Sequence, residues 1–572
     1  MPLPLGEHLE QLRTEVRRDR DIALAQLDEH LAKPLKKRLE TFRTIGPLTI
    51  EKVVGRQIYL KSSIPEESFF SPQQPVRLSR NNPLQEPFIR GTFFGLIDEF
   101  LVVDSFQADE VGTDSSTIWT IDEDFVDLTH FYLETIEELG ETTIGREKIL
   151  PTLFGNPDTS CDPDFYNDTL DELEEQAGID QSQTQAIANS VSAQCHLVQG
   201  PPGTGKTRTL AQTVNRLVIS GKRIFVSGFT HRSINNALTK IIETVGRDCP
   251  VVKIGRFAEY ERDEAFESIE SIDDCDHDFT EGPFVIGATP FTLRSKRLPG
   301  IIFDHALIDE TSQMTTPLAA MVMLRSKAWT FYGDQRQLPP VSFYYAQDPN
   351  KASVFHRLQS EDNSTSLNIT YRLNADLTEW PSETFYGGNL KSHIDRKLSL
   401  LDASPPFSFL AGSPALVRIV NNEEDTRARN DTEVETVAQS IEHLLRNGLS
   451  PKEIGVVCPF RAQAAAIRGR LRLVSEDHDE VTVDTVDRFQ GQERRIIFVS
   501  LATAHERFLS QMERFLANPQ RLNVAVTRAQ SKVVLLHSQN FADYCEKHAQ
   551  EAPDTWGIAY SLLCAATVYP DI

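Results

Sequence analysis

The 572-residue sequence has few of the features that mark secreted, metal-binding or membrane proteins. Its seven cysteines are scattered and include no Cys-x-x-Cys pair, which argues against a disulfide framework, a structural zinc or an iron–sulfur cluster. No run of about 18 apolar residues is present, so we expect no membrane span. The first residues, MPLPLGEHLEQLRTEVRRDRD, contain no apolar core of signal-peptide length. We therefore expect a reducing, cytoplasmic location, with the nucleus left open.

A net basic charge is also absent. The formal net charge is -25, and 40% of the residues are hydrophobic, as in an ordinary soluble globular protein. No overall positive field draws in nucleic acid, which argues against a histone-like or tail-driven binder. A local basic channel stays open, because phosphate contacts need only a few placed side chains.

Five segments follow from the patterning of apolar residues. Steps of three and four residues predict a helix over 6–43, bent at Pro34. Runs such as LTIEKVVGRQIYLKSS predict strands, whereas buried-type strands such as CHLVQG and HALIDE alternate with helical stretches and predict parallel sheets. The segments are a stalk helix (1–44), a small β domain (45–125), a second stalk helix and linker (126–175), and two α/β units (176–345 and 346–572).

A phosphate-binding loop is the clearest motif. HLVQGPPGTGKTRTL contains G-x-x-x-x-G-K-T between a predicted strand and a predicted helix, which is the context that the motif requires. Its glycines allow backbone N–H groups to surround phosphate oxygens, Lys206 would reach the β- and γ-phosphates, and the Thr207 hydroxyl would ligate Mg²⁺. The predicted ATP-binding loop consists of Gly200, Pro201, Pro202, Gly203, Thr204, Gly205, Lys206 and Thr207.

The partners of this loop are also present. In HALIDETSQM, Asp309 would hold the Mg²⁺ shell and Glu310 would orient and deprotonate the attacking water. Upstream, Gln183 carries an amide that matches the N6/N7 edge of adenine. The alternative, that Gln183 is a surface residue without a role in binding, is equally open. The sequence therefore predicts an ATP hydrolase that uses Mg²⁺.

The motifs together resemble superfamily 1 helicases. The chain is similar to the 5′→3′ branch (1B) that contains the nonsense-mediated decay RNA helicase, in the DNA2-NAM7-like family. The resemblance covers roughly residues 180–540 and implies two tandem RecA-like P-loop domains of α/β class, preceded by a helical stalk and a small β-barrel-like domain. The motifs are, in order, SQTQAI, GPPGTGKT, GFTHRSINNAL, DETSQ, GDQRQLPPV, TYRLN, NDTEVETV, IGVVCPFRAQ, VDTVDRFQGQE and RLNVAVTRAQ.

The resemblance implies further roles at the ATP site. Tyr371 would stack on the base, and Glu493 would accept from a ribose hydroxyl. Arg372 and Arg528 would reach the γ-phosphate from the second unit, where guanidinium groups suit the charge that develops on the phosphoryl group. Gln337, in GDQRQLPPV, would sense the γ-phosphate, whereas its neighbour Arg336 would be a bystander.

The implied nucleic-acid contacts are hydroxyl, backbone and basic groups that touch phosphates without reading sequence. Arg461 also begins a local basic cluster with Arg468, Arg470 and Arg472, for which a solvated helix face is equally open. Whether RNA or DNA is bound stays open. The residues that would grip the sugar–phosphate backbone are Thr230, His231, Ser233, Thr289 and Thr485, whereas Pro459, Phe460 and Arg461 would pack on the strand.

The sequence also departs from the family pattern. The usual His-Pro after the Tyr-Arg pair is replaced in YRLN, and Gln530 stands where a basic residue is usual. Neither a zinc-binding regulatory domain nor a nuclease domain is recognisable. An acidic segment, 259–281, carries eleven acids and one arginine, and we expect an exposed helical or loop insertion there.

The expected function is an ATP-dependent helicase or translocase that moves 5′→3′ on single-stranded RNA or DNA. The alternative is a nucleic-acid-stimulated ATPase that acts as a clamp or switch in a larger complex without processive unwinding. Protein partners would dock on the N-terminal third or the acidic segment, and no membrane partner is expected. A scaffold with a dead site is disfavoured because Lys206, Asp309, Glu310, Arg372 and Arg528 are all present.

Overall fold

The computed structural model divides the chain into two compact units. One is Arg13–Leu133, and the other joins Met1–Leu12 to Glu134–Ile572. The structure describes residues 5–40, 43–62, 70, 74–80, 82–97, 100–111, 117–155, 160–174, 176–246, 249–255, 265–279, 282–393, 405–474 and 478–570.

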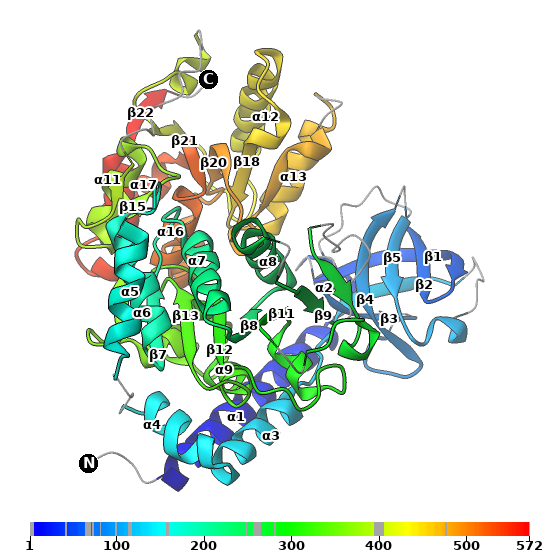
Figure 1. The fold of residues 1–572 in the computed structure, drawn as a ribbon. Coiled ribbons are helices and arrows are strands. Elements are labelled where there is room, and N and C mark those ends of the chain that lie inside the picture. Colours follow the sequence, from blue (N-terminus) through cyan, green and yellow to red (C-terminus); the bar gives the residue numbers. More distant parts are fainter. Residues whose placement is uncertain are drawn as a thin grey trace. The chain divides into compact units, whose positions relative to one another are not determined.

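The first unit contains a closed barrel of six antiparallel strands (Figure 1). The strand order is β1-β2-β5-β4-β3-β6, and β6 pairs back with β1, so the barrel leaves no open edge. Inward-facing residues that alternate along the strands, such as Ile58 and Leu60, form its core. The strands are β1 (Thr44–Val54), β2 (Gln57–Ser62), β3 (Pro75–Ser79), β4 (Phe88–Ile97), β5 (Phe100–Asp104) and β6 (Trp119–Glu123).

The helix predicted over 6–43 is wrong at its C-terminal end. Helix α1 (Leu5–Leu31) stops before Pro34, and a separate short helix, α2 (Leu35–Leu39), follows. Proline has no N–H to donate and disfavours the helical conformation in the residue before it, so Pro34 breaks the helix rather than bending it. The chain then enters β1 at Thr44.

Helix α2 is tied to the barrel by a buried ion pair. Arg38 is 1% exposed and its guanidinium contacts the Asp122 carboxylate on β6, which is 0% exposed. The hydroxyls of Thr44 and Thr120 donate to the same carboxylate at 2.6 and 3.1 Å. Removing one member of such a pair leaves an uncompensated buried charge.

The first prediction concerns this ion pair. Arg38→Met is expected to destabilise the barrel by about 3–5 kcal/mol, because Asp122 stays buried without its cation. Hydrogen exchange followed by mass spectrometry on peptides from β1 and β6 measures the change. The control is Arg56→Met, which breaks the exposed pair with Asp104 and should cost about 0–1 kcal/mol. Equal exchange in the two variants would contradict the structural role of Arg38.

The second unit contains two parallel sheets. The eight-stranded first sheet has the order β10-β9-β11-β8-β12-β13-β7-β14, and helices α6, α7 and α8 pack against one of its faces. Its strands are β7 (Cys195–Gln199), β8 (Arg223–Gly228), β9 (Val251–Ile254), β10 (Glu267–Ile269), β11 (Phe284–Gly287), β12 (His305–Asp309), β13 (Trp329–Gly333) and β14 (Ser364–Ser366). The helices are α6 (Gln181–Ser192), α7 (Lys206–Ile219), α8 (His231–Val245), α9 (Thr316–Met323) and α10 (Val354–Leu358).

The second sheet has six strands in the order β19-β18-β20-β21-β17-β22. One hydrophobic cluster joins one face to α12 and α13, and another joins the opposite face to α11, α16, α17 and α18. Its strands are β17 (Leu416–Asn421), β18 (Ile454–Cys458), β19 (Thr482–Thr485), β20 (Arg494–Ser500), β21 (Ala529–Ser538) and β22 (Thr567–Pro570). The helices are α11 (Ala375–Phe385), α12 (Asp431–Arg446), α13 (Arg461–Leu471), α14 (Glu506–Gln511), α15 (Glu513–Leu516), α16 (Pro519–Val526), α17 (Gln539–His548) and α18 (Ile558–Ala565).

These sheets confirm the predicted fold class of two α/β units with helices on parallel sheets. The predicted boundary between the units at residue 345 is wrong, because β14 pairs in parallel with β7 of the first sheet. The first α/β unit therefore extends at least to Ser366, and residues 367–373 connect the two parallel sheets. Two small strands, β15 (Ile369–Thr370) and β16 (Lys391–Ser392), pair beside this connection.

Two other segments differ from expectation. The described residues of the stretch 126–175 form three α-helices, α3 (Thr129–Glu141), α4 (Leu150–Leu153) and α5 (Pro163–Glu174), and a π-helical turn at Gly145–Ile149. The described part of the acidic segment contains no α-helix: Glu267–Ile269 form the edge strand β10, beside which Phe266 and Ile269 are buried, and Ile272–Asp274 form a short 3-10 turn. Residues 256–264 and 280–281 lie outside the described part of the chain. None of the helices that the structure describes is long and apolar enough to cross a membrane.

Candidate active site

Three strand ends meet at one edge of the first sheet. Strand β13 lies between β7 and β12, and the three are parallel, so their carboxyl ends share that edge. The N–H of Gly200 donates to the carbonyl of Gly333 at 2.8 Å. The loop after β7, the acids at the end of β12 and the loop after β13 are thereby brought together.

The loop after β7 depends on two glycines. Gly203 and Gly205 have φ angles of 74° and 78°, which glycine adopts without strain. A Cβ on Gly203 would lie 2.3 Å from the Cβ of Arg372, and one on Gly205 would lie 2.6 Å from Nε2 of Gln183. Side chains at these positions would therefore displace two residues predicted to bind ATP.

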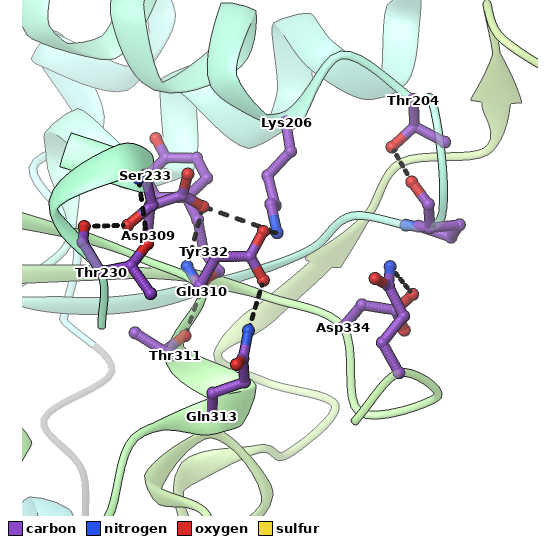
Figure 2. Close-up of polar contacts among 12 residues, drawn as sticks. Thr204, Lys206, Thr230, Ser233, Asp309, Glu310, Thr311, Gln313, Tyr332 and Asp334 are labelled. Atoms are coloured by element: carbon purple, nitrogen blue, oxygen red, sulfur yellow. Dashed lines mark hydrogen bonds and ion pairs between the residues drawn. The ribbon is translucent and has the colours of Figure 1, made fainter. Parts of the chain in front are cut away.

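Lys206 begins α7 and points between two carboxylates (Figure 2). Its Nζ lies 3.1 Å from Oε1 of Glu310 and 3.5 Å from Oδ1 of Asp309. Burial alone would lower the pKa of Lys206, but the two carboxylates raise it above its usual value. Burial raises the pKa of Asp309. At Glu310 burial also acts to raise the pKa, but Lys206, with Arg528 and Gln313, lowers it below its usual value.

Glu310 has an unusual backbone. Its φ of 53° lies in the left-handed region, which costs a non-glycine residue about 1–3 kcal/mol. The Thr311 hydroxyl donates to the carbonyl of Tyr332 at 2.8 Å, and Gln313 Nε2 lies 3.4 Å from Glu310 Oε2 (Figure 2). These contacts hold the strained residue so that its carboxylate faces Lys206.

The loop after β13 contains a buried carboxylate, Asp334, that is 1% exposed. Gln337 is 6% exposed, and its Nε2 donates to Asp334 Oδ2 at 2.8 Å. Its Oε1 accepts from Nη2 of Arg528 at 3.2 Å. Burial and the nearby Arg372 lower the pKa of Arg528. The side chain of Arg336 is exposed and takes no part in these contacts.

Arg372 was expected in the second α/β unit, and the structure places it in the connection between the two sheets. Its Nε donates to Oε2 of Glu493 at 2.6 Å, and Nη1 donates to the carbonyl of Thr527 at 3.1 Å. Gln530 Nε2 donates to the other carboxylate oxygen of Glu493 at 3.0 Å. Glu493, predicted to accept from a ribose, thus contacts Arg372, and the unusual Gln530 supports it.

The predicted base-binding residues already have polar partners. The Tyr371 hydroxyl donates to Oδ2 of Asp180 at 3.0 Å, and its ring lies 4.7 Å from that of His393. Gln183 is buried; its Nε2 donates to the carbonyl of Thr204 at 3.0 Å and its Oε1 accepts from the N–H of Asp180 at 3.4 Å. Gln183 therefore holds the phosphate-binding loop in this structure. The contact of His393 with the Tyr371 ring was not predicted from the sequence.

A cleft of about 570 Å³ unites most of the predicted ATP-site residues. It is lined by residues 200–207 together with Asp309, Glu310, Gln337, Tyr371, Arg372, Glu493 and Arg528. Thr230 and Ser233, predicted to contact nucleic acid, also line this cleft. Sequence reasoning did not identify several other lining residues, although their motifs were quoted: Arg232, Asn236, Gln313, Asp487, Arg488, Gln490 and Gly491.

The predicted nucleic-acid contacts of the first sheet lie at helix starts. The Thr230 hydroxyl caps α8 by accepting from the N–H of Ser233 at 3.1 Å. Burial, with Lys253 nearby, lowers the pKa of the next residue, His231, to about 4, so its imidazole is neutral at pH 7. Thr289 lies 3.3 Å, hydroxyl to hydroxyl, from Thr292.

Of the residues near the second sheet that were predicted to contact nucleic acid, some pack in the protein and others carry polar groups. Pro459 is buried, and the Phe460 ring packs on Phe508 and Phe515 with centroids 5.7 and 5.4 Å apart. Thr485 ends β19 and is buried, and Arg461 is partly exposed at the start of α13. Phe460 is therefore part of an aromatic cluster.

The basic cluster on α13 is also divided. Arg470 makes two bonds to Glu435, at 2.6 and 2.9 Å, and so contributes to a surface ion pair on α12 and α13. Arg468 instead donates to the carbonyl of Val483 at 2.6 Å, close to Thr485. Arg472 is exposed.

Comparison with known proteins identifies the family. Two family models described as AAA domain match residues 178–282 and 350–540. The chain is 27% identical over 387 residues to the DNA replication ATP-dependent helicase/nuclease JHS1 of Arabidopsis thaliana, covering 63% of this chain and 28% of that one. It is 28% identical over 409 residues to the Regulator of nonsense transcripts 1 homolog of Drosophila melanogaster, covering 63% and 34%. The chain belongs to the superfamily 1 helicases of the DNA2-NAM7-like family.

The fraction of the relative's length that this chain covers differs from one relative to another. The chain is 27% identical over 467 residues to the DNA polymerase alpha-associated DNA helicase A of Schizosaccharomyces pombe, covering 69% of this chain and 68% of that one. It spans only 28% and 29% of the first two relatives, both named helicase/nuclease.

The second prediction tests whether Glu310 is the general base that the sequence predicts for ATP hydrolysis. Glu310→Gln is expected to lower ATP turnover by about 100- to 10,000-fold, because an amide cannot take a proton from water. Binding of a fluorescent ATP analogue should persist, since Lys206 and the glycine loop are unchanged. The control is Glu243→Gln, which alters an exposed ion pair with Lys240 on α8. Full turnover by Glu310→Gln would contradict this role.

Proposed function

We propose that this protein is an ATP-dependent helicase or translocase that moves 5′→3′ on single-stranded RNA or DNA. One observation carries the proposal: Lys206 lies between Asp309 and Glu310 in a cleft that Arg372 and Arg528 also line. Family membership supports the activity, and the direction of movement rests on the resemblance to the 1B branch.

The cleft fits a nucleoside triphosphate. Gly205 caps α7 without a side-chain hydrogen bond, so the first N–H groups of this helix are available to phosphate oxygens. The left-handed Gly203 and Gly205 curl the loop, and Lys206 provides a cation at its end. The helix dipole favours negative charge at the same place.

The donor set also fits Mg²⁺. Asp309 and Glu310 are two adjacent carboxylates that share a single ammonium, Lys206, and burial raises the pKa of Asp309. The Thr207 hydroxyl lines the same cleft. Carboxylate and hydroxyl oxygens are suitable ligands, so Thr207 and Asp309 would hold the ion, which would supply charge neutralisation on the phosphates.

Hydrolysis would follow from the remaining side chains. Lys206 would leave its carboxylates for the β- and γ-phosphate oxygens, and Glu310 would orient the attacking water and take its proton. Arg372 would exchange Glu493 for phosphate oxygens, and Arg528 would approach from the second sheet beside Gln337. Preorganised cations of this kind stabilise the charge that develops on the transferring phosphoryl group.

Nucleic acid would bind through groups that contact phosphates without reading bases. The candidates on the first sheet are Thr230, His231, Ser233 and Thr289. On the second sheet, Thr485 would contact the sugar–phosphate backbone, whereas Pro459, Phe460 and Arg461 would pack on the strand. Because the named relatives include DNA helicases and a regulator of nonsense transcripts, the proposal keeps both RNA and DNA as substrates.

The third prediction tests the proposed activity directly. ATP hydrolysis should rise when single-stranded RNA or DNA is added at one fixed salt concentration, because salt strongly alters nucleic-acid affinity. Lys206→Ala should reduce the stimulated rate by about 100- to 1,000-fold, since the phosphates lose a preorganised cation. The control is Lys327→Ala, which removes an exposed lysine paired with Asp304 at the opposite end of β12. Full stimulated turnover by Lys206→Ala would disprove the proposed site.

The fourth prediction separates movement from a clamp. Gln337→Ala should keep ATP binding but reduce strand displacement by about 10- to 100-fold, because Gln337 joins Asp334 to Arg528. Arg336→Ala is the matched control, since that neighbouring side chain is exposed. Unchanged displacement by Gln337→Ala would refute its coupling role. Robust ATPase without displacement by the unaltered protein would instead favour the clamp or switch.

A further inference from the structure

Tyr386 lies at the C-terminal end of α11, outside every motif quoted from the sequence. Its ring packs against the hydrophobic cluster of the second sheet and contacts Phe385 edge to face. Burial, with Asp334 nearby, raises the pKa of Tyr386 well above its usual value. The hydroxyl is therefore protonated at neutral pH and can act as a donor.

This hydroxyl joins the two sheets. It donates to Oδ2 of Asp334 at 2.8 Å, in the loop after β13 of the first sheet. It accepts from Nδ2 of Asn523 on α16 at 3.0 Å, and the same amide donates to the carbonyl of Arg336 at 2.8 Å. Leu338 of this loop also packs in the hydrophobic cluster of the second sheet. The loop after β13 is thus anchored to α11 and α16.

The bonds to Asp334 determine which way the Gln337 amide faces. Oδ1 accepts from the side chain of Gln199 and from the N–H of Arg336, and Oδ2 accepts from Gln337 and Tyr386. Burial raises the pKa of Asp334, whereas the bonds from Gln337, Arg336 and Tyr386 lower it and favour the ionised form, which only accepts hydrogen bonds. Gln337 must therefore present its Nε2 to Asp334, which leaves its Oε1 for the guanidinium of Arg528.

We propose that Tyr386 is a positioning residue that holds Asp334, and through it the Gln337 amide and Arg528, in the arrangement needed for stimulated ATP hydrolysis. The inference rests on the proposed function and adds a residue to its site. Tyr386 itself does not line the cleft formed by the described residues, so it acts through Asp334 rather than on the nucleotide.

The fifth prediction follows from removing only the hydroxyl. Tyr386→Phe should lower kcat of nucleic-acid-stimulated ATP hydrolysis by about 10- to 100-fold, because Gln337 and Arg528 lose their fixed orientation. KM for ATP and the affinity for a fluorescent ATP analogue should stay within about twofold, since the phosphate loop is unchanged. A merely structural role would not separate kcat from KM in this way.

The matched control is Tyr560→Phe. Tyr560 lies on α18, and its hydroxyl donates to Oε1 of Glu546 on α17 at 3.1 Å, among the helices of the second sheet. The variant removes the same atom from the same type of residue without breaking a bond between the sheets. Its kcat should match that of the unaltered protein.

A double variant tests whether Tyr386 acts through Gln337. If it does, Tyr386→Phe combined with Gln337→Ala should be no slower than Gln337→Ala alone, because residues in one network are not additive. If the fold-losses in kcat of the two single variants multiplied in the double variant, the inference would be overturned. A normal stimulated kcat in Tyr386→Phe would overturn it while the proposed function stands, whereas absence of ATPase in the unaltered protein would overturn both.

Discussion

Parallel pairing of β7, β13 and β12 is the constraint on which the site depends. The register places Gln199 opposite Gly333, so the phosphate loop and the loop after β13 leave the sheet side by side. The bond from Gly200 to Gly333 and the bond from Gln199 to Asp334 fix that arrangement. Asp309 ends β12 at the same edge, where Lys206 meets its carboxylate. A slip in this pairing would separate these groups.

The charge pairs that line the cleft show how the proposed triphosphate and divalent cation would be accommodated. Every cation that would contact phosphate already has a partner: Lys206 has two carboxylates, Arg372 has Glu493, and Arg528 has the Gln337 amide. An unpaired charge that is removed from water raises the free energy of the folded protein. Each cation is therefore paired with a protein group, which a bound phosphate would have to replace. A bound phosphate would therefore replace the existing protein partners of these cations, rather than form ion pairs with cations that have no partner.

The phosphate-binding loop could be predicted from the sequence, because its strand, glycine loop and helix are contiguous in the chain. The bond between Arg372 and Glu493 joins residues 121 positions apart, and no local pattern reports it. Tyr386 carries no motif signal, and its hydroxyl matters only because α11 packs near the loop after β13. The strand in the acidic segment was missed because two buried residues, Phe266 and Ile269, are outnumbered by charges.

The two arginines near the phosphate loop are held differently. The connection that carries Arg372 is bound to this loop, through the N–H of Tyr371 to the carbonyl of Gly203 at 2.8 Å and the Thr370 hydroxyl to the carbonyl of Pro202 at 2.8 Å. Arg528 instead follows α16 and meets the first sheet through Gln337 at 3.2 Å. If the sheets separate, the backbone of Arg372 stays beside the phosphate loop, whereas Arg528 leaves with α16. In the proposed mechanism, Arg528 is therefore the arginine that would make hydrolysis depend on a closed cleft.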